Sequence, residues 1–196
     1  MVVDVDEVLG MFMRGFESFL VGRGYEMRIT RFALFQNIYR PGAAEHLDVA
    51  TGRSLFEEYF ASDCEHMEVT PGAVDALGRL SKRAGIVILT NAPGHGREPR
   101  ARWLARHGLH YPLVIGSGPK GAPVAALNAR TQGPVAFIDD LLPNLDSVAA
   151  DAPDVSRFQH VADERLRPLA FTAPERHARI DDWPTLGAAV EAAIRR

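Results

Sequence analysis

The sequence has a single cysteine, only two lysines and no long uninterrupted apolar stretch. Because Cys64 has no second cysteine to pair with, an intrachain disulfide and a cysteine-rich zinc site are both excluded. The apolar runs are far shorter than the roughly 18 residues of a membrane span. The first residues are strand-like instead of forming a cationic, cleavable leader. We therefore expect a cytoplasmic protein with no membrane partner.

The sequence also lacks a large excess of charge of either sign, since the formal net charge is -3 and the pI is near 6.2. This balance gives no reason to expect a nucleic acid polymer as partner and favours a small solute. The seven histidines are dispersed, without the spacing of a zinc centre. A length of 196 residues allows one substantial core with a small insertion.

Four short apolar runs each end abruptly in polar residues. Runs of this kind, without alternation, are typical of parallel strands buried on both faces. Because the carboxyl ends of parallel strands meet at one edge of a sheet, the polar residues that follow are expected to form one site. The polar endings are Asp4-Val5-Asp6, Thr90-Asn91, the glycine-rich loop with Lys120, and Asp139-Asp140.

The strands and the intervening helical patterns predict an α/β fold, with a parallel sheet flanked by helices. One more strand is expected around 155–161. Residues 10–69 differ, because they hold ten of the fourteen phenylalanine and tyrosine residues and no buried-strand run. Their aromatic side chains recur at helical spacing, which predicts a small helical insertion whose aromatics form its own core. Tyr39 is the first candidate among them to touch a substrate.

Three groups of residues in the insertion recur at helical spacing. They are Phe12, Phe16, Phe19 and Leu20, then Phe32, Phe35 and Tyr39, then Leu55, Phe56, Tyr59 and Phe60. The insertion leaves the sheet after Leu9 and returns at Thr70, so it should lie above the carboxylate edge. The predicted domains are therefore a core, 1–9 and 70–196, and a cap, 10–69.

Carboxylates gathered at one edge repel each other and need a cation. A set of oxygen ligands favours a hard ion, and Mg²⁺ in particular keeps few protein ligands together with water and phosphate oxygens. An aspartate can attack phosphorus, with a second carboxyl as acid and base, matching Asp6. A hydroxyl and a cation that hold phosphoryl oxygens match Thr90 and Lys120. A lysine at this position is notable because Lys82 is the only other lysine in the chain.

These motifs, in this order, resemble those of the haloacid dehalogenase-like (HAD) hydrolase superfamily. The four are Asp4-Val5-Asp6-Glu7-Val8-Leu9, then Val87-Ile88-Leu89-Thr90-Asn91, then Gly118-Pro119-Lys120-Gly121, and Phe137-Ile138-Asp139-Asp140 with Asn144 shortly after. The resemblance implies a Rossmann-like core with strand order 3-2-1-4-5 and a helical cap after the first motif. Glu7 departs from it, because the family often has glycine there.

Carried over to this chain, the resemblance implies that Asp4 is the nucleophile and Asp6 the general acid and base. It implies that Thr90 and Asn91 hold phosphate together with Lys120. Mg²⁺ would be bound by Asp4, by the Asp6 carbonyl and by the acidic pair, with Asp140 the more direct ligand and Asp139 acting partly through water.

The resemblance therefore implies a magnesium-dependent phosphatase acting on a small phosphomonoester through an aspartyl-phosphate. The expected partner is a small phosphorylated metabolite. His95, Arg97 and Arg100, and Arg31 and Arg40 in the cap, are candidates for a second anionic group of the substrate, with ordinary surface charge as the alternative. Two other functions stay open, a phosphomutase or phosphotransferase of the same superfamily and a non-catalytic ligand-binding module on this scaffold.

Overall fold

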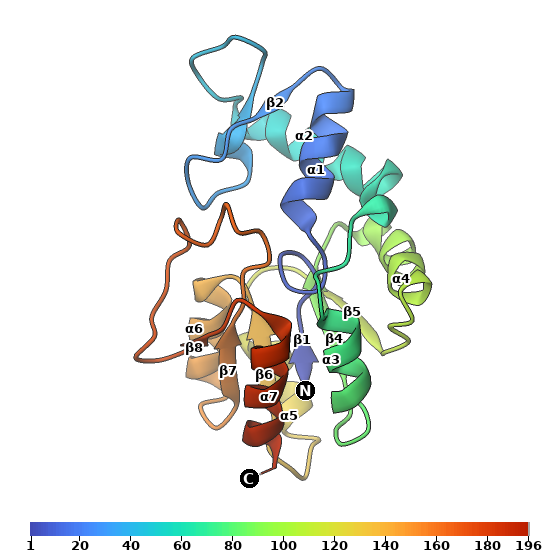
Figure 1. Ribbon diagram of the computed structural model, residues 1–196, viewed down its shortest axis with the longest axis vertical. Helices are drawn as coiled ribbons and strands as arrows, with labels where there is room; N and C mark the ends of the chain where they lie inside the picture. The colour runs from blue at the N-terminus through green and yellow to red at the C-terminus, as the bar shows by residue number, and fades with distance from the viewer. Residues whose placement is uncertain (196) are drawn as a thin grey trace.

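The computed structural model describes residues 1–195 and contains a six-stranded sheet in which adjacent strands run parallel. The strand order is β5-β4-β1-β6-β7-β8 (Figure 1). The strands are β1 (Val2–Val3), β4 (Val87–Asn91), β5 (Leu113–Gly116), β6 (Ala136–Asp139), β7 (Ser156–Gln159) and β8 (Ala178–Arg179). The predicted α/β Rossmann-like core and the predicted order of its first five strands are confirmed. The short β8 extends the sheet by one strand that the sequence pattern did not indicate.

Five helices accompany this sheet, and they divide between its two faces. They are α3 (Ala73–Leu80), α4 (Arg97–Arg106), α5 (Gly121–Asn128), α6 (Leu142–Asp151) and α7 (Trp183–Ile194). Val2 of β1 packs in one apolar cluster with Val124 of α5 and Val148 of α6. The next residue, Val3, packs in the other cluster with Leu77 of α3 and Leu186 of α7. Because both faces are covered, the strand needs apolar residues at successive positions.

Residues 10–69 form a group of elements that lies beyond the carboxyl ends of the strands (Figure 1). The elements are α1 (Phe12–Gly22), β2 (Glu26–Met27), a short 3-10 helix (Phe35–Asn37), β3 (Ile38–Tyr39), α2 (Val49–Ser62) and a second 3-10 helix (Cys64–His66). The two longer helices pack through their aromatic rings, as in the edge-to-face pair of Phe12 and Tyr59 at 5.5 Å between ring centroids. The aromatics of the first and third predicted groups therefore do pack together in an aromatic core.

The prediction of a helix through Phe32, Phe35 and Tyr39 was wrong. Met27 pairs with Ile38 in the antiparallel β2–β3 ribbon, so the middle of the segment is a hairpin. Between the strands, the buried Asn37 accepts a hydrogen bond from the Thr30 backbone and donates to two backbone carbonyls of the loop. These contacts hold an irregular loop in place of a helix. The helical spacing of the three rings along the sequence was therefore coincidental.

The two chain connections between these elements and the sheet run side by side. The backbone N–H of Thr70 donates to Leu9 O at 2.8 Å, and that of Met11 donates to Glu68 O at 2.8 Å. Gly10 lies between them, and a Cβ there would lie 2.1 Å from the Met67 methyl carbon, so a larger residue would force the Met67 side chain to move. This pairing fixes how the chain leaves and re-enters the sheet. None of the helices within residues 1–195 is long and apolar enough to cross a bilayer.

Candidate active site

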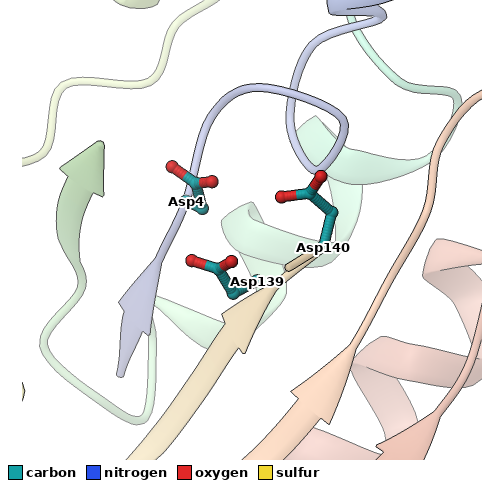
Figure 2. A group of neighbouring side chains, drawn as sticks. All are labelled: Asp4, Asp139 and Asp140. Carbon is teal, nitrogen blue, oxygen red and sulfur yellow. The ribbon is translucent and has the colours of Figure 1, made fainter. Parts of the chain in front are cut away.

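Three buried carboxylates meet where β1 and β6 end. Asp4 directly follows β1, Asp139 is the last residue of β6 and Asp140 comes next, as Figure 2 shows. The two strands are neighbours, and the Asp4 N–H donates to Ile138 O at 3.0 Å. As a result, one carboxylate oxygen from each of the three aspartates lies within 4.8 Å of the other two. Oxygen donors at this spacing form an acidic cluster that can hold a metal ion.

Lys120 links two of these carboxylates. Its Nζ lies 2.8 Å from Asp4 Oδ1 and 2.7 Å from Asp139 Oδ2, and its side chain is only 2% exposed. Burial lowers the pKa of Lys120, but the carboxylates of Asp139 and Asp4 raise it more, so the net pKa lies above its usual value. The lysine is therefore a permanent cation that fixes the orientation of both carboxylates.

The two members of the acidic pair have different surroundings. Both carboxylate oxygens of Asp139 have protein partners, since Asp139 also accepts hydrogen bonds from the Leu141 backbone and the Asn144 amide, both at 2.9 Å. No hydrogen bond or ion pair within residues 1–195 reaches the Asp140 carboxylate. Burial, followed by repulsion from Asp139, raises the pKa of Asp140 well above its ordinary value. Asp140 is thus the carboxylate that gains most from a bound cation.

Thr90 and Asn91, at the end of β4, complete the polar side of the site. The Thr90 side chain is buried, and its hydroxyl has no hydrogen-bond partner among the described residues. The Asn91 amide donates to Gly118 O at 2.9 Å, which ties the end of β4 to the loop that carries Lys120. A buried hydroxyl without a partner is costly unless a ligand completes it.

Asp6, the second residue of the first motif, is paired with Arg100 of α4. Arg100 Nη2 donates to Asp6 Oδ1 at 2.6 Å, and the Arg100 side chain is completely buried. Burial raises the pKa of Asp6 to about 6, and the Arg100 charge opposes that rise. Asp6 therefore exchanges its proton close to neutral pH.

Glu7 occupies a backbone position that favours glycine. Its φ is 58°, the only positive φ of a non-glycine residue in the described part of the chain. The side chain is buried, and its two oxygens accept hydrogen bonds from the backbones of Met13 and Asp163, at 2.8 and 2.9 Å. Burial raises the pKa of Glu7 to about 7 while these bonds oppose the rise. Glu7 thereby connects the start of α1 to the loop that follows β7.

A cavity of about 210 Å³ opens above these residues. Asp4, Asp6, Thr90, Asn91, Lys120 and Asp140 all line it, so the structure brings six site residues predicted from widely separated motifs to one place. The remaining lining residues are Glu7, Phe12, Met13, Phe32, Ala33, Leu34, Phe56, Leu141, Asn144 and Leu166. Asp139 lies just beneath the lining, against Lys120.

Several sequence candidates lie away from this cavity. His95 contacts the Glu57 backbone carbonyl at 3.1 Å, and Arg97 begins α4 without lining the cavity. Arg100 pairs with Asp6 instead of facing the cavity. Tyr39 lies in the β2–β3 ribbon with the Arg28 guanidinium 4.5 Å from its ring centroid, also outside the lining.

The Arg31 and Arg40 side chains are exposed and do not line the cavity either. Sequence reasoning missed the pairing of Arg100 with Asp6 and the aromatic lining by Phe32. The only local signal for the arginine was its place in the segment after Thr90, which does not show which way a helical side chain points.

No protein-family model and no curated protein matches the chain. Solved structures do. A putative HAD-hydrolase from Bacillus subtilis, YfnB, described as bound to magnesium, aligns with a TM-score of 0.64 at 13% identity over 96% of each chain. A D,D-heptose 1,7-bisphosphate phosphatase from B. bronchiseptica, complexed with magnesium and phosphate, aligns with a TM-score of 0.54 at 12% identity, over 98% of this chain and 97% of the other.

A putative beta-phosphoglucomutase from Thermotoga maritima aligns with a TM-score of 0.57 at 12% identity over 97% of each chain. Identities this low show the fold and not the reaction. The fold of this chain is that of HAD-superfamily hydrolases, and an aspartate cluster able to hold a metal lies at the carboxyl edge of its sheet.

Proposed function

We propose that this chain is a magnesium-dependent phosphatase that hydrolyses a small phosphomonoester through an aspartyl-phosphate on Asp4. The observation that carries the proposal is the position of Asp4, whose carboxylate lies in the cavity and is held by Lys120 at 2.8 Å. Asp6 lies two residues away in the same cavity, and the unpartnered Thr90 hydroxyl is beside them. The HAD-like fold of the neighbours supports the same reaction class.

In the first step, a carboxylate oxygen of Asp4 attacks phosphorus and the bond from phosphorus to the ester oxygen breaks. Asp6 transfers a proton to the departing oxygen, so an alcohol leaves. In the second step, Asp6 takes a proton from water as the water attacks the aspartyl-phosphate. Inorganic phosphate is released and Asp4 is restored. A pKa of about 6 suits Asp6 to both proton transfers near neutral pH.

The phosphoryl oxygens would be held by the groups that surround Asp4. The Thr90 hydroxyl and the backbone after it supply hydrogen bonds, and the Lys120 ammonium supplies positive charge. Lys120 also fixes the position of the Asp4 carboxylate, because its ammonium is buried against it at 2.8 Å. Each of these roles matches the one that the motif resemblance implies.

The donor set fits Mg²⁺. Asp4 and Asp140, with the Asp6 backbone carbonyl, would hold the ion, and Asp139 would act from behind Lys120 because its oxygens already have protein partners. When bound, the ion offsets the negative charge of the carboxylates and of the phosphoryl group. The crowding that raises the pKa of Asp140 is the structural reason to expect a cation there.

The proposal includes the division of the chain into a core, 1–9 and 70–196, and a cap, 10–69, that covers the site. It also includes a small phosphorylated metabolite of the cytoplasm as the substrate. The phosphomutase reading is favoured by one structural neighbour. A mutase must hold a second phosphate, however, and Lys120 is the only basic side chain in the cavity lining formed by residues 1–195. Phosphate release is therefore the preferred outcome.

The test is release of inorganic phosphate from a panel of nucleotides, sugar phosphates and small esters, with Mg²⁺ or with a chelator. We expect turnover that depends on Mg²⁺ and falls by roughly 10³-fold or more in Asp4→Asn. The matched control is Asp75→Asn in the first turn of α3, away from the cavity, which should keep wild-type turnover. Equal turnover in wild type and Asp4→Asn would contradict the proposal. Tight ligand binding without turnover, unchanged in Asp4→Asn, would favour the binding-module reading instead.

A further inference from the structure

The cavity over Asp4 has two chemically different halves. The polar side chains in the lining come from the ends of the strands, from the loops that follow them and from the first turn of α6. The opposite wall is formed by side chains of residues 10–69, and none of these carries a charge, a hydroxyl or an amide. This apolar wall consists of Phe12, Met13, Phe32, Ala33, Leu34 and Phe56.

The rings of the apolar wall are held in place by packing against one another and against neighbouring rings. Phe12 and Phe56 lie 6.0 Å apart between ring centroids, although they belong to different helices. Phe35 supports Phe56 from behind at 6.1 Å and does not line the cavity. On the core side, Leu141 and Leu166 extend the apolar lining. A substrate group above the phosphate therefore meets carbon on several sides.

Among residues 1–195, Lys120 is the only cation in the cavity lining. Arg31 directly precedes Phe32 of the wall, but its side chain is exposed and does not line the cavity. Lys120 already bridges two carboxylates. A second phosphate or a carboxylate on the substrate would find no further cation in the lining, only the carboxyl groups of Asp6, Glu7 and Asp140.

Sugar hydroxyl groups would also lack hydrogen-bond partners from side chains on this side of the cavity. The wall offers no side chain to exchange hydrogen bonds with them, and a buried hydroxyl without a partner is unfavourable. A ring or a short chain of carbon loses nothing there. An apolar cavity of about 150 Å³ is enough for a benzene ring. A volume of about 210 Å³ therefore suits a phosphoryl group together with roughly one ring or short chain.

We infer that the substrate is a small phosphomonoester whose leaving group is uncharged and apolar, an aryl, arylmethyl or short alkyl alcohol, received by the apolar wall. The inference rests on the proposed function for the identity of the reacting group. It goes further by naming the class of alcohol that leaves. Nucleotides, sugar phosphates and bisphosphates are then poor substrates.

A binding experiment tests the wall separately from catalysis. Phosphonates are not hydrolysed, so their dissociation constants are measured by calorimetry on the wild-type protein with Mg²⁺. Benzylphosphonate should bind at least about tenfold more tightly than methylphosphonate. Phosphonopropionate, which adds a carboxylate, should bind more weakly than benzylphosphonate by at least as much. Equal affinity for benzylphosphonate and methylphosphonate overturns the inference.

A pair of variants locates the effect. Phe32→Ala removes a half-buried ring from the apolar wall and should remove most of the preference for benzylphosphonate, while binding of methylphosphonate is unchanged. Phe171→Ala removes an exposed ring that does not line the cavity, and it should keep the preference. If both variants keep the wild-type preference, the ring binds somewhere else and the inference fails.

Turnover separates this inference from the proposed function. Benzyl phosphate and glucose 6-phosphate are both primary phosphate esters, so their kcat/KM values compare leaving groups of similar chemistry. We expect benzyl phosphate to exceed glucose 6-phosphate by at least about tenfold. Faster hydrolysis of glucose 6-phosphate overturns the inference and leaves the phosphatase intact. The expected phosphonate preference without hydrolysis of any ester supports the apolar ligand class and removes the phosphatase proposal.

Discussion

Arg100 and Asp6 form an ion pair of 2.6 Å between residues 94 positions apart in the chain. The Arg100 guanidinium lies 5.1 Å from the ring centroid of Phe60 and is completely buried. Two of its nitrogens, Nε and Nη1, have no hydrogen-bond partner among the described residues. Because this buried cation pairs with Asp6, it holds the Asp6 carboxyl group in one orientation.

Arg100 is therefore expected to be a positioning residue for the proposed acid and base. Arg100→Met keeps the bulk of the side chain and removes the charge, so kcat should fall by roughly 10²-fold as Asp6 loses its orientation. KM should change much less, because Arg100 does not line the cavity. Steady-state kinetics on the best ester of the panel measures both. Arg102→Met on the same helix, where the side chain is half exposed and pairs with Glu65, is the control. An unchanged kcat in Arg100→Met would rule the positioning role out.

Asp139 and Asp140 should respond in opposite directions when neutralised. Asp139→Asn breaks a buried pair with Lys120, so the free energy of unfolding without metal should fall by about 3 kcal/mol. Asp140→Asn removes a buried carboxylate that lacks a partner among residues 1–195 and is repelled by Asp139, so the same free energy should rise by about 1 kcal/mol. Denaturant unfolding in a chelator measures both. Calorimetric titration with Mg²⁺ should show the larger loss of affinity in Asp140→Asn, and a larger loss in Asp139→Asn would reverse the assignment.

Two glycines in helices should respond oppositely to alanine. A Cβ on Gly121 of α5 would lie 2.4 Å from the backbone oxygen of Ser147 in α6, so Gly121→Ala forces the two helices apart. We expect a loss of roughly 1–3 kcal/mol in the free energy of unfolding. A Cβ on Gly78 of α3 would have no neighbouring atom within 4 Å, so Gly78→Ala should stabilise by about 0.4–1 kcal/mol. Denaturant midpoints compare them, and equal effects would show that the α5–α6 contact is not close.

The free energy of unfolding should depend on pH through His160. Its ring is buried beside Trp183, with Nδ1 at 2.8 Å from Ile180 O, and burial lowers the pKa of His160. The unfolded chain therefore binds a proton first as the pH falls below about 6.5, and the folded state loses stability over that range. His160→Asn can keep a donor towards Ile180 but has no such titration.

Unfolding free energies at pH 7.5 and 5.5 check this. The stability of wild type relative to His160→Asn should be greater at pH 7.5 and smaller at pH 5.5. His66→Asn, which removes an imidazole whose side chain is 73% exposed, separates the effect of burial from the loss of any imidazole. A relative stability of His160→Asn that does not change with pH would show that the pKa of His160 is the same in the folded and unfolded states.

The core architecture was readable from the sequence because its signals are local. Parallel strands buried on both faces require consecutive apolar residues, and those at 86–89 and 135–138 end directly in Thr90 and Asp139. The carboxyl-edge rule then brings such endings together without knowledge of any side-chain contact. The strand β8 was not predicted, because Ala178–Arg179 is too short to leave a pattern.

Only the tertiary structure decided which residues share the cavity. The ring spacing of Phe32, Phe35 and Tyr39 looked helical, yet a hairpin and the buried Asn37 placed Phe32 in the lining and Tyr39 outside it. Arg100 looked like a ligand for substrate and instead pairs with Asp6. The residues that follow each apolar run were enough to predict the chemistry at the ends of the strands. The direction of each remaining side chain depends on packing between distant segments, which no local pattern records.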